Sequence, residues 1–292
     1  MFVSLAAIWG ASFLFMRIAA PVIGALWTAQ LRITLAALVL VFYVWATKKA
    51  HFIRPKTKEF WILGAFNTAF PFALFSYAAL SLPAGYLSIL NAIIPLFAAI
   101  FSIFMLGERL TWRVVVGSVV AMSGIALMVQ LGPVVPTRET IFAVLACGIA
   151  TVFYGFSGVW SKKYLAGVPG VVNATNSQLF AAISLLPLTL SSPLPKNVPL
   201  EAWAAVIALA VVCSAMAYLM FFKLLETWTV TRVASVSFLI PVFGIFWGWL
   251  FLNEPVTINM VYGFILILIA TALTMGVGPF AKKSPAKSQA SS

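Results

Sequence analysis

Long apolar runs alternate with short polar breaks along the whole chain of 292 residues. A membrane-spanning helix needs about 20 mainly apolar residues. Charge clusters, prolines and glycines divide the chain into ten runs of about this length, at 2–19, 24–47, 60–80, 84–106, 112–130, 139–161, 171–190, 201–225, 231–252 and 256–278. The first run lacks the basic start of a cleaved signal peptide, so we expect it to be retained. The pattern predicts an all-α membrane protein with ten transmembrane helices.

Composition supports lipid as the main solvent of the chain. Hydrophobic residues make up 63% and charged residues 8%, whereas soluble domains contain about 25% charged residues. A soluble domain of this size needs a large polar exterior, and there are too few polar residues here to build one.

Basic residues are distributed very unequally between the two sides of the predicted bundle. Fourteen of the 18 Lys and Arg residues fall on one side, two on the other, and Arg17 and Arg32 lie within spans. Cytoplasmic loops carry the excess of basic residues, so we expect a multi-pass protein of a bacterial inner membrane with both termini in the cytoplasm. The formal charge of +12 does not indicate a nucleic-acid partner, because the basic residues sit in short gaps between apolar runs and do not form a patch with aromatic residues between them.

Two junctions, LGERLTW (106–112) and LNEPVTI (252–258), reveal an internal repeat. At an offset of 146 residues Pro95 aligns with Pro241 and Glu108 with Glu254, while at 145 WGAS (9–12) aligns with YGFS (154–157). The chain is therefore predicted to be two five-helix repeats, 1–131 and 139–278, followed by a disordered basic tail at 281–292. Because five is odd, the second repeat must be inverted, as in secondary transporters whose substrate site lies between the halves.

Sequence signals for chemistry at a metal, nucleophile or phosphate site are missing. There is no CxxC, HExxH, GxSxG, GxxxxGK or GxGxxG pattern, which weakens an enzyme interpretation. We expect no cofactor and no metal site. Cys147 and Cys213 lie inside apolar runs and are expected to be packed free thiols.

With these motifs the chain resembles the EamA-type branch of the drug/metabolite transporter superfamily, and within it the YddG-type amino-acid exporters. The resemblance rests on the two junctions, on Pro95 and Pro241, on the starts WGASFLFMR and YGFSGVWSKKY, and on GSVVAMSGIALM (117–128). It implies a ten-helix transporter fold whose central cavity is lined mainly by the first, third, fourth, sixth, eighth and ninth helices. The fifth and tenth helices would support the bundle from outside the cavity.

Polar and aromatic residues inside the spans are the candidates for holding a small-molecule substrate, because ligand sites combine apolar walls with a few hydrogen-bonding groups. They are Trp9, Ser12, Asn67, Ser76, Tyr77, Ser88, Asn91, Tyr154, Ser157, Trp160, Ser214, Tyr218 and Ser237. Helix-to-helix hydrogen bonds are the alternative role for the asparagines, and packing or bonding to their own helix for the serines. Interfacial positions are the alternative for Tyr77, Trp160 and Tyr218.

Arg17 and Arg32 are predicted near the outer ends of the first two helices. They either snorkel to headgroups or cap carbonyls, or they form an outer vestibule that attracts a substrate carboxylate. Pro71, Pro95 and Pro241 lie deep inside spans, where proline kinks a helix; they are candidate gating hinges, with a static kink as the alternative. Glu108 and Glu254 are interpreted as charges facing the positive end of the next helix, in preference to substrate contact.

No aspartate occurs in the chain, and the six glutamates all fall near helix ends. Because no acid is left at mid-membrane to carry a proton or bind sodium, we expect transport without obligatory ion coupling. The predicted function is alternating-access export of amino acids, with aromatic or other apolar ones favoured. The alternatives are export of drugs or other metabolites and, in other classes, an intramembrane enzyme or a lipid-binding scaffold. Small residues at 117–124 favour packing within a monomer over a weak dimer contact.

Overall fold

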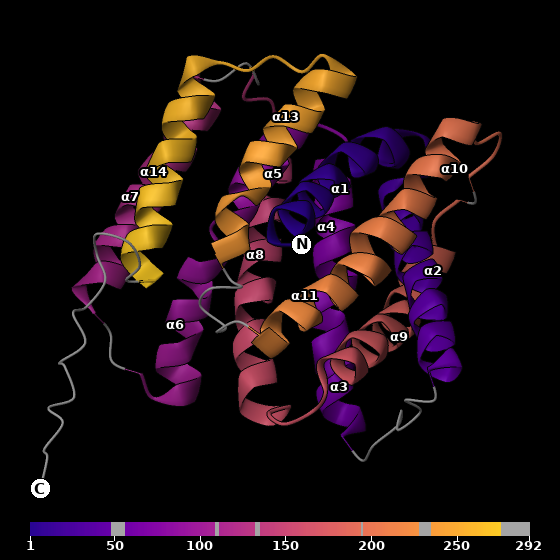
Figure 1. Cartoon of the computed structure of the whole chain (residues 1–292). Coiled ribbons are helices and arrows are strands. Elements are labelled where there is room, and N and C mark those ends of the chain that lie inside the picture. Colours follow the sequence, from indigo (N-terminus) through magenta and orange to yellow (C-terminus); the bar gives the residue numbers. More distant parts are fainter. Residues whose placement is uncertain (48–55, 109–110, 132–134, 194, 228–234, 276–292) are drawn as a thin grey trace, which may run out of the picture.

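The computed structural model describes residues 1–47, 56–108, 111–131, 135–193, 195–227 and 235–275 (Figure 1). The predicted tail at 281–292 lies outside these residues. The helices of the first half are α1 (Phe2–Ile23), α2 (Ala25–Ala46), α3 (Thr57–Gly64), η1 (Ala65–Ala69), α4 (Phe70–Ala78), α5 (Ala84–Asn91), α6 (Ile94–Leu106) and α7 (Trp112–Leu131). Those of the second half are α8 (Arg138–Tyr164), α9 (Gly170–Leu190), α10 (Leu200–Ile207), η2 (Ala208–Met216), α11 (Ala217–Thr227), η3 (Ser235–Phe238), α13 (Ile240–Leu252) and α14 (Ile258–Met275).

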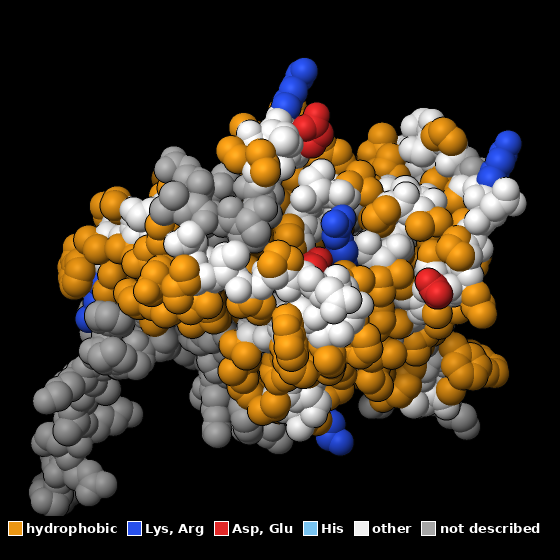
Figure 2. All heavy atoms as spheres, turned by 90° about the horizontal axis from the view of Figure 1, so that it is seen from above, with side chains coloured by type: hydrophobic (Ala, Val, Ile, Leu, Met, Phe, Trp, Pro, Cys, Tyr) orange, Lys and Arg blue, Asp and Glu red, His pale blue; other side chains and the backbone are white. Residues whose placement is uncertain are grey.

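Within the described residues, each of the ten predicted spans coincides with one helix or with a run of consecutive helices, which confirms the all-α fold of two inverted five-helix repeats. Residues 231–234 and 276–278 of the last two predicted spans lie outside the described residues. Seven helical segments of the described chain are long and apolar enough to cross a membrane, and three shorter apolar helices cover the remaining spans. Hydrophobic side chains also cover much of the perimeter of the face seen in Figure 2, where few charged groups appear. Such a surface suits a lipid environment.

The third span of each half contains a π-helical segment. Residues 65–69 form η1 between α3 and α4, and residues 208–216 form η2 between α10 and α11. At the repeat offset of 146, η1 maps onto residues within η2, so this irregularity belongs to the repeat itself. In the first half Pro71 is the second residue of α4, so the chain continues as a helix from η1 into a residue that has no N–H to donate. Single-turn π segments are frequent at functional sites.

The fourth span of each half is broken near its proline, which differs from the single kinked helix that the sequence suggested. Ala92 and Ile93 separate α5 from α6, and Pro95 lies in the first turn of α6. In the second half Leu239 separates η3 from α13, and Pro241 lies in the first turn of α13. Proline is stable in a first turn, where no intrahelical N–H bond is lost, so both spans restart just before their prolines.

The first helix of each half packs against the broken helix of the other half. A Cβ atom on Gly10 of α1 would lie 2.7 Å from Cβ of Phe243 in α13, and one on Gly155 of α8 would lie 2.6 Å from Cβ of Phe97 in α6. Gly10 and Gly155 are repeat mates, and so are Phe97 and Phe243. The shared WG and YG starts are thereby explained, because only glycine permits this close approach.

The fifth helices, α7 and α14, pack against each other at one side of the bundle (Figure 1). A Cβ atom on Gly124 would lie 2.9 Å from the carbonyl oxygen of Gly263, so the small residues of α7 are used in packing within the chain. This arrangement keeps the fifth helices away from the polar residues that lie among the other spans.

Candidate functional site

The two glutamate junctions have the same backbone conformation. Gly107 ends α6 with φ 70° and Asn253 ends α13 with φ 51°, both in the left-handed region. The next N–H in each case donates back into the helix, from Glu108 to the Ser102 carbonyl at 3.3 Å and from Glu254 to the Gly248 carbonyl at 3.2 Å. Gly and Asn are the residues that favour this helix cap. The cap places one glutamate directly after each broken helix.

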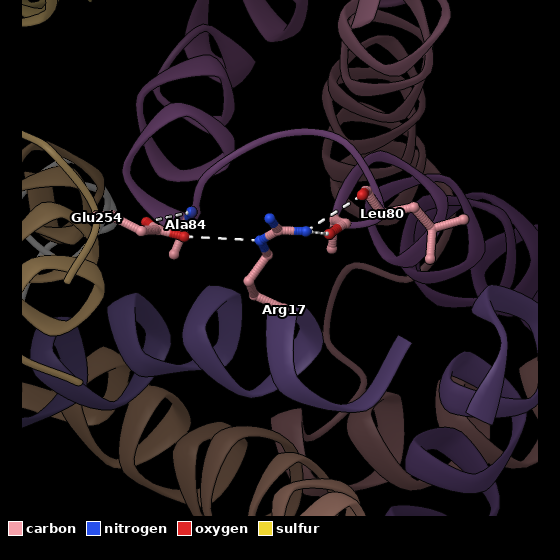
Figure 3. A network of polar contacts seen from close by, with 5 residues as sticks. Arg17, Leu80, Ala84 and Glu254 are labelled. Carbon is pink, nitrogen blue, oxygen red and sulfur yellow. Dashed lines mark hydrogen bonds and ion pairs between the residues drawn. The ribbon is translucent and has the colours of Figure 1, made fainter. Parts of the chain in front are cut away.

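Glu254 closes one end of the bundle by joining the two halves (Figure 3). Its Oε2 accepts a hydrogen bond of 2.8 Å from the N–H of Ala84, at the start of α5. Its Oε1 lies 3.7 Å from Nε of Arg17 on α1. Arg17 Nη1 also donates to the carbonyls of Ala79 at 2.8 Å and Leu80 at 3.2 Å, where α4 ends. We call these five residues the Arg17–Glu254 latch.

The latch corrects the expected partner of Glu254 and selects one of the two predicted roles of Arg17. Glu254 faces the positive end of α5 in the first half, and not that of the helix that follows it in the chain, as the sequence suggested. Arg17 caps backbone carbonyls, which was one of its two predicted roles. It also lines two shallow hollows of about 360 and 420 Å³ beside the latch, so this end of the bundle forms only a shallow vestibule.

The carboxylate of Glu254 is held in a tight and mostly apolar setting. A Cβ atom on Gly248 would clash with its Oε2, so the glycine makes room for the carboxylate. Burial raises the pKa of Glu254, although the Ala84 N–H and Arg17 act in the opposite direction. The protonated form of Glu254 is therefore favoured by the closed latch more than by water.

A second ion pair lies at the symmetry-related position of the other junction. Arg17 maps onto Lys162 at an offset of 145 and Glu254 maps back onto Glu108 at 146, and Lys162 Nζ lies 3.7 Å from Glu108 Oε1. The side chains of Lys162 and Glu108 are 69% and 54% exposed, compared with 32% and 13% for Arg17 and Glu254. One pair is therefore packed into a closed end, while its mate lies open to solvent.

Between the two ends, polar side chains from several spans form hydrogen bonds at membrane depth. Asn67 of η1 accepts a hydrogen bond of 3.0 Å from Ser157 of α8 and donates one of 3.4 Å to the Tyr218 hydroxyl of α11. The hydroxyls of Thr68 and Ser177 lie 3.0 Å apart. Three of the predicted substrate-binding residues, Asn67, Ser157 and Tyr218, are thus brought together, with helix-to-helix hydrogen bonds between them.

Arg32 lies in the interior of the bundle, and this differs from the outer vestibule predicted from the sequence. The residue is 4% exposed. Its Nε donates to Ser214 Oγ at 2.9 Å, its Nη1 lies 3.7 Å from Met16 Sδ, and its guanidinium carbon lies 3.7 Å from the centre of the Phe72 ring. The sequence suggested the outer position because Arg32 comes early in its span, but its side chain is directed towards α1, α4 and η2.

The remaining candidates lie in more varied places. Ser12 and Ser88 donate to carbonyls of their own helices, and the buried Ser76 hydroxyl has no hydrogen-bond partner among the described residues. Tyr77 is 41% exposed, and Trp160 donates to the Glu59 carbonyl at 3.3 Å. Half-buried positions are taken by Trp9 against Phe221, by Tyr154 against Phe75, by Asn91 at the end of α5 and by Ser237 in η3.

Sequence reasoning missed several buried polar residues. Thr68, Ser177 and Gln178 were not among the candidates, although all three are at most 2% exposed. Both polar atoms of the Gln178 side chain are buried without a hydrogen-bond partner among the described residues. The signal that could have found Gln178 is the repeat, because the offset of 146 pairs it with Arg32.

An inverted two-repeat bundle with buried polar residues between its halves and a latch at one end defines a multi-pass membrane transporter. Comparison with known proteins gives the family. Residues 1–130 and 141–276 match the EamA-like transporter family. The chain belongs to that family.

Two of three similar proteins are named as a probable exporter or a probable efflux pump. The chain is 28% identical to Protein PecM of Dickeya dadantii, over 77% of this chain and 76% of that protein. It is 26% identical to the probable terminal-alkyne amino-acid exporter of Streptantibioticus cattleyicolor, with 84% and 82% covered. It is 23% identical to the probable amino-acid metabolite efflux pump of Salmonella typhimurium, with 89% of each covered.

A solved crystal structure shares the fold. The match has a TM-score of 0.65 at 22% identity and covers 93% of this chain and 94% of the other. At this identity the likeness concerns the fold alone.

Proposed function

We propose that this protein exports amino acids, with aromatic and other apolar ones favoured, across a bacterial inner membrane by alternating access. The single observation that carries the mechanism is the pair of symmetry-related ion pairs, one packed into a closed end and the other exposed. An inverted repeat can exchange the conformations of its two halves, and this exchange opens one end as it closes the other. The amino-acid substrate is supported by the two relatives that are named as probable amino-acid exporter or efflux pump.

Transport in this proposal needs no coupled ion. The glutamates whose side chains are described, Glu59, Glu108, Glu139, Glu201 and Glu254, all lie at helix ends or in junctions, and the buried polar cluster contains no acid among these residues. Polar neutral groups and Arg32 are left to hold a substrate, which then moves down its own gradient.

The test is counterflow in proteoliposomes that contain the purified full chain. Vesicles loaded with one unlabelled amino acid at a time should take up its labelled form, and a panel of the natural amino acids should rank the substrates. Uptake should proceed without an imposed pH gradient. Absence of counterflow for every amino acid would exclude the amino-acid proposal, and strict dependence on the pH gradient would exclude uncoupled transport.

A further inference from the structure

The position of Arg32 raises the question of where its countercharge comes from. The guanidinium remains charged at any ordinary pH, and it is buried at a depth where unpaired charge is strongly unfavourable. Among the residues that the structure describes, neither ion pair involves Arg32, and its polar partners there are the Ser214 hydroxyl and the Met16 thioether. The described part of the protein therefore supplies hydrogen bonding and ring contact to this cation but no neutralising carboxylate.

Several donors of Arg32 remain for another partner. A guanidinium has five N–H donors in a planar fork that matches the two oxygens of a carboxylate. The bond to Ser214 uses one of them, and the contact with Met16 sulfur uses a second only weakly. The Phe72 ring covers one face of the guanidinium and so fixes the plane of the fork.

The inverted repeat makes this arrangement asymmetric in charge. At an offset of 146, Arg32 maps onto Gln178, Phe72 onto Tyr218 and Thr68 onto Ser214. The same three positions therefore occur twice in the bundle. One set contains the cation Arg32, and the other contains the neutral amide Gln178. Both amide atoms of Gln178 are buried without a partner in the described structure, so this second set also has unused hydrogen-bonding capacity.

We propose that Arg32 is the receptor for the carboxylate of the transported molecule and that Gln178 binds a polar group elsewhere on it. The fork of Arg32 pairs with one carboxylate, so the site selects molecules that carry a free carboxylate, as every amino acid does. Phe72 supplies aromatic surface beside Arg32, and Tyr218 takes the position of Phe72 in the second half. This inference rests on the proposed function, because it assigns the substrate class of the same transport site.

Binding can be tested separately from transport. Thermal unfolding of the detergent-purified full chain would be measured with each natural amino acid, and then with the amide and the decarboxylated amine of each one that stabilises it. The acid should stabilise the protein and the two analogues should not. Charged hydrogen bonds contribute about 1.5–3 kcal/mol, so affinity for the analogues should fall by roughly tenfold or more.

Three variants identify the residue. Arg32→Gln, which introduces the side chain that the second half has at this position, should lose the stabilisation by the acid. Arg32→Lys should keep part of it, because it keeps the charge without the fork. Arg138→Gln removes an exposed arginine that stacks on Phe142 and should respond as the wild type does.

Several results would overturn the proposal. They are equal stabilisation by acid and amide, an Arg32→Gln protein that binds the acid as tightly as the wild type, and no stabilisation by any amino acid. If Arg32→Gln does not fold, the proposal is tested by comparing stabilisation by the acid with stabilisation by the amide, in the wild type and in Arg32→Lys. If the protein binds the acid selectively through Arg32 but shows no counterflow, the transport proposal is overturned and the carboxylate site stands. If it shows counterflow of the acid and of its amide alike, the carboxylate site is overturned and the transport proposal stands.

Discussion

At the scale of single residues, the repeat is preserved where two helices approach each other most closely. Gly10 and Gly155 occupy equivalent contacts with Phe243 and Phe97, and in each contact an added Cβ atom would lie under 3 Å from its neighbour. The residues that flank these glycines in the chain differ between the halves, Trp9 and Ala11 in one and Tyr154 and Phe156 in the other, but the glycine does not. Its role follows from the space available and needs no substrate.

The glycines of α8 permit a matched test of this packing. Gly155→Ala should destabilise the protein by about 1–3 kcal/mol, because overpacking forces the facing helix to shift. Gly158→Ala lies one turn further along the same helix with nothing within 4 Å of the added Cβ. It should be neutral or slightly stabilising, since alanine favours a helix. Thermal unfolding in detergent measures both, and equal effects would contradict the close contact.

At the scale of elements, the breaks at Pro95 and Pro241 divide the fourth span of each half into two pieces. The longer pieces, α6 and α13, pack extensively against the first helix of the other half, and the short piece α5 begins at Ala84 of the latch. Interior proline destabilises a continuous helix by about 3 kcal/mol or more, so each proline favours the break. A break at equivalent positions in both halves is the arrangement that paired hinges require.

Replacing these prolines separates a hinge from a fixed bend. Pro95→Ala and Pro241→Ala should slow counterflow while substrate binding, measured by thermal shift, stays near the wild-type affinity. The reason is that alanine restores an N–H group and favours continuation of the helix across the break. Pro136→Ala, outside the spans, is the control and should leave both quantities unchanged. If binding and transport fall together, the prolines shape the site and do not act as hinges.

The latch makes the closed form sensitive to pH. Because the pKa of Glu254 is raised on burial, the closed form binds the proton more tightly than the opened or unfolded form. The resulting stabilisation is complete below the ordinary glutamate pKa of about 4.3 and is lost as pH rises through the raised value. The wild type should therefore gain thermal stability as the pH is lowered from 7 towards the ordinary glutamate pKa of about 4.3.

Glu254→Gln isolates this effect, since glutamine can still accept the hydrogen bond from Ala84 but does not titrate in this range. The difference in melting temperature between the wild type and Glu254→Gln should shift with pH in favour of the wild type as acid is added. Glu108→Gln removes the exposed mate of Glu254 and is the control for the loss of a junction carboxylate that is not buried. A constant difference for Glu254→Gln across this range would contradict a raised pKa.

At the scale of the whole molecule, the sequence was sufficient for the architecture and insufficient for the interior. Span number, inversion and the paired junctions follow from hydropathy and an offset of 146, because they depend on local composition and repetition. The burial of Arg32, the partner of Glu254 and the π segments depend on how distant helices pack. Arg32 is an example. Its position near the start of a span indicated a place near the membrane surface, but its side chain is directed to neighbours 16 and 182 residues away in the chain.

Orientation in the membrane can be tested on the two junctions. Single cysteines at Thr111 and Pro255, both exposed, should react with a membrane-impermeant thiol reagent from opposite sides. The Pro255 position should be labelled in intact cells and the Thr111 position only after the membrane is opened. The native Cys147 and Cys213 are buried and provide the unlabelled background. Labelling of both positions from the same side would contradict the inverted repeat.

The crossed contacts of Gly10 and Gly155 limit how such a protein can be divided. In each half alone, the surface beside the glycine of the first helix and the surface of the broken helix would lack a packing partner, because the other half supplies both partners. A solitary five-helix unit would have to insert in both directions and pair with an upside-down copy of itself. When the two units are joined in one chain, neither has to find an oppositely oriented partner. The two copies can then also differ in sequence, as Arg32 and Gln178 do.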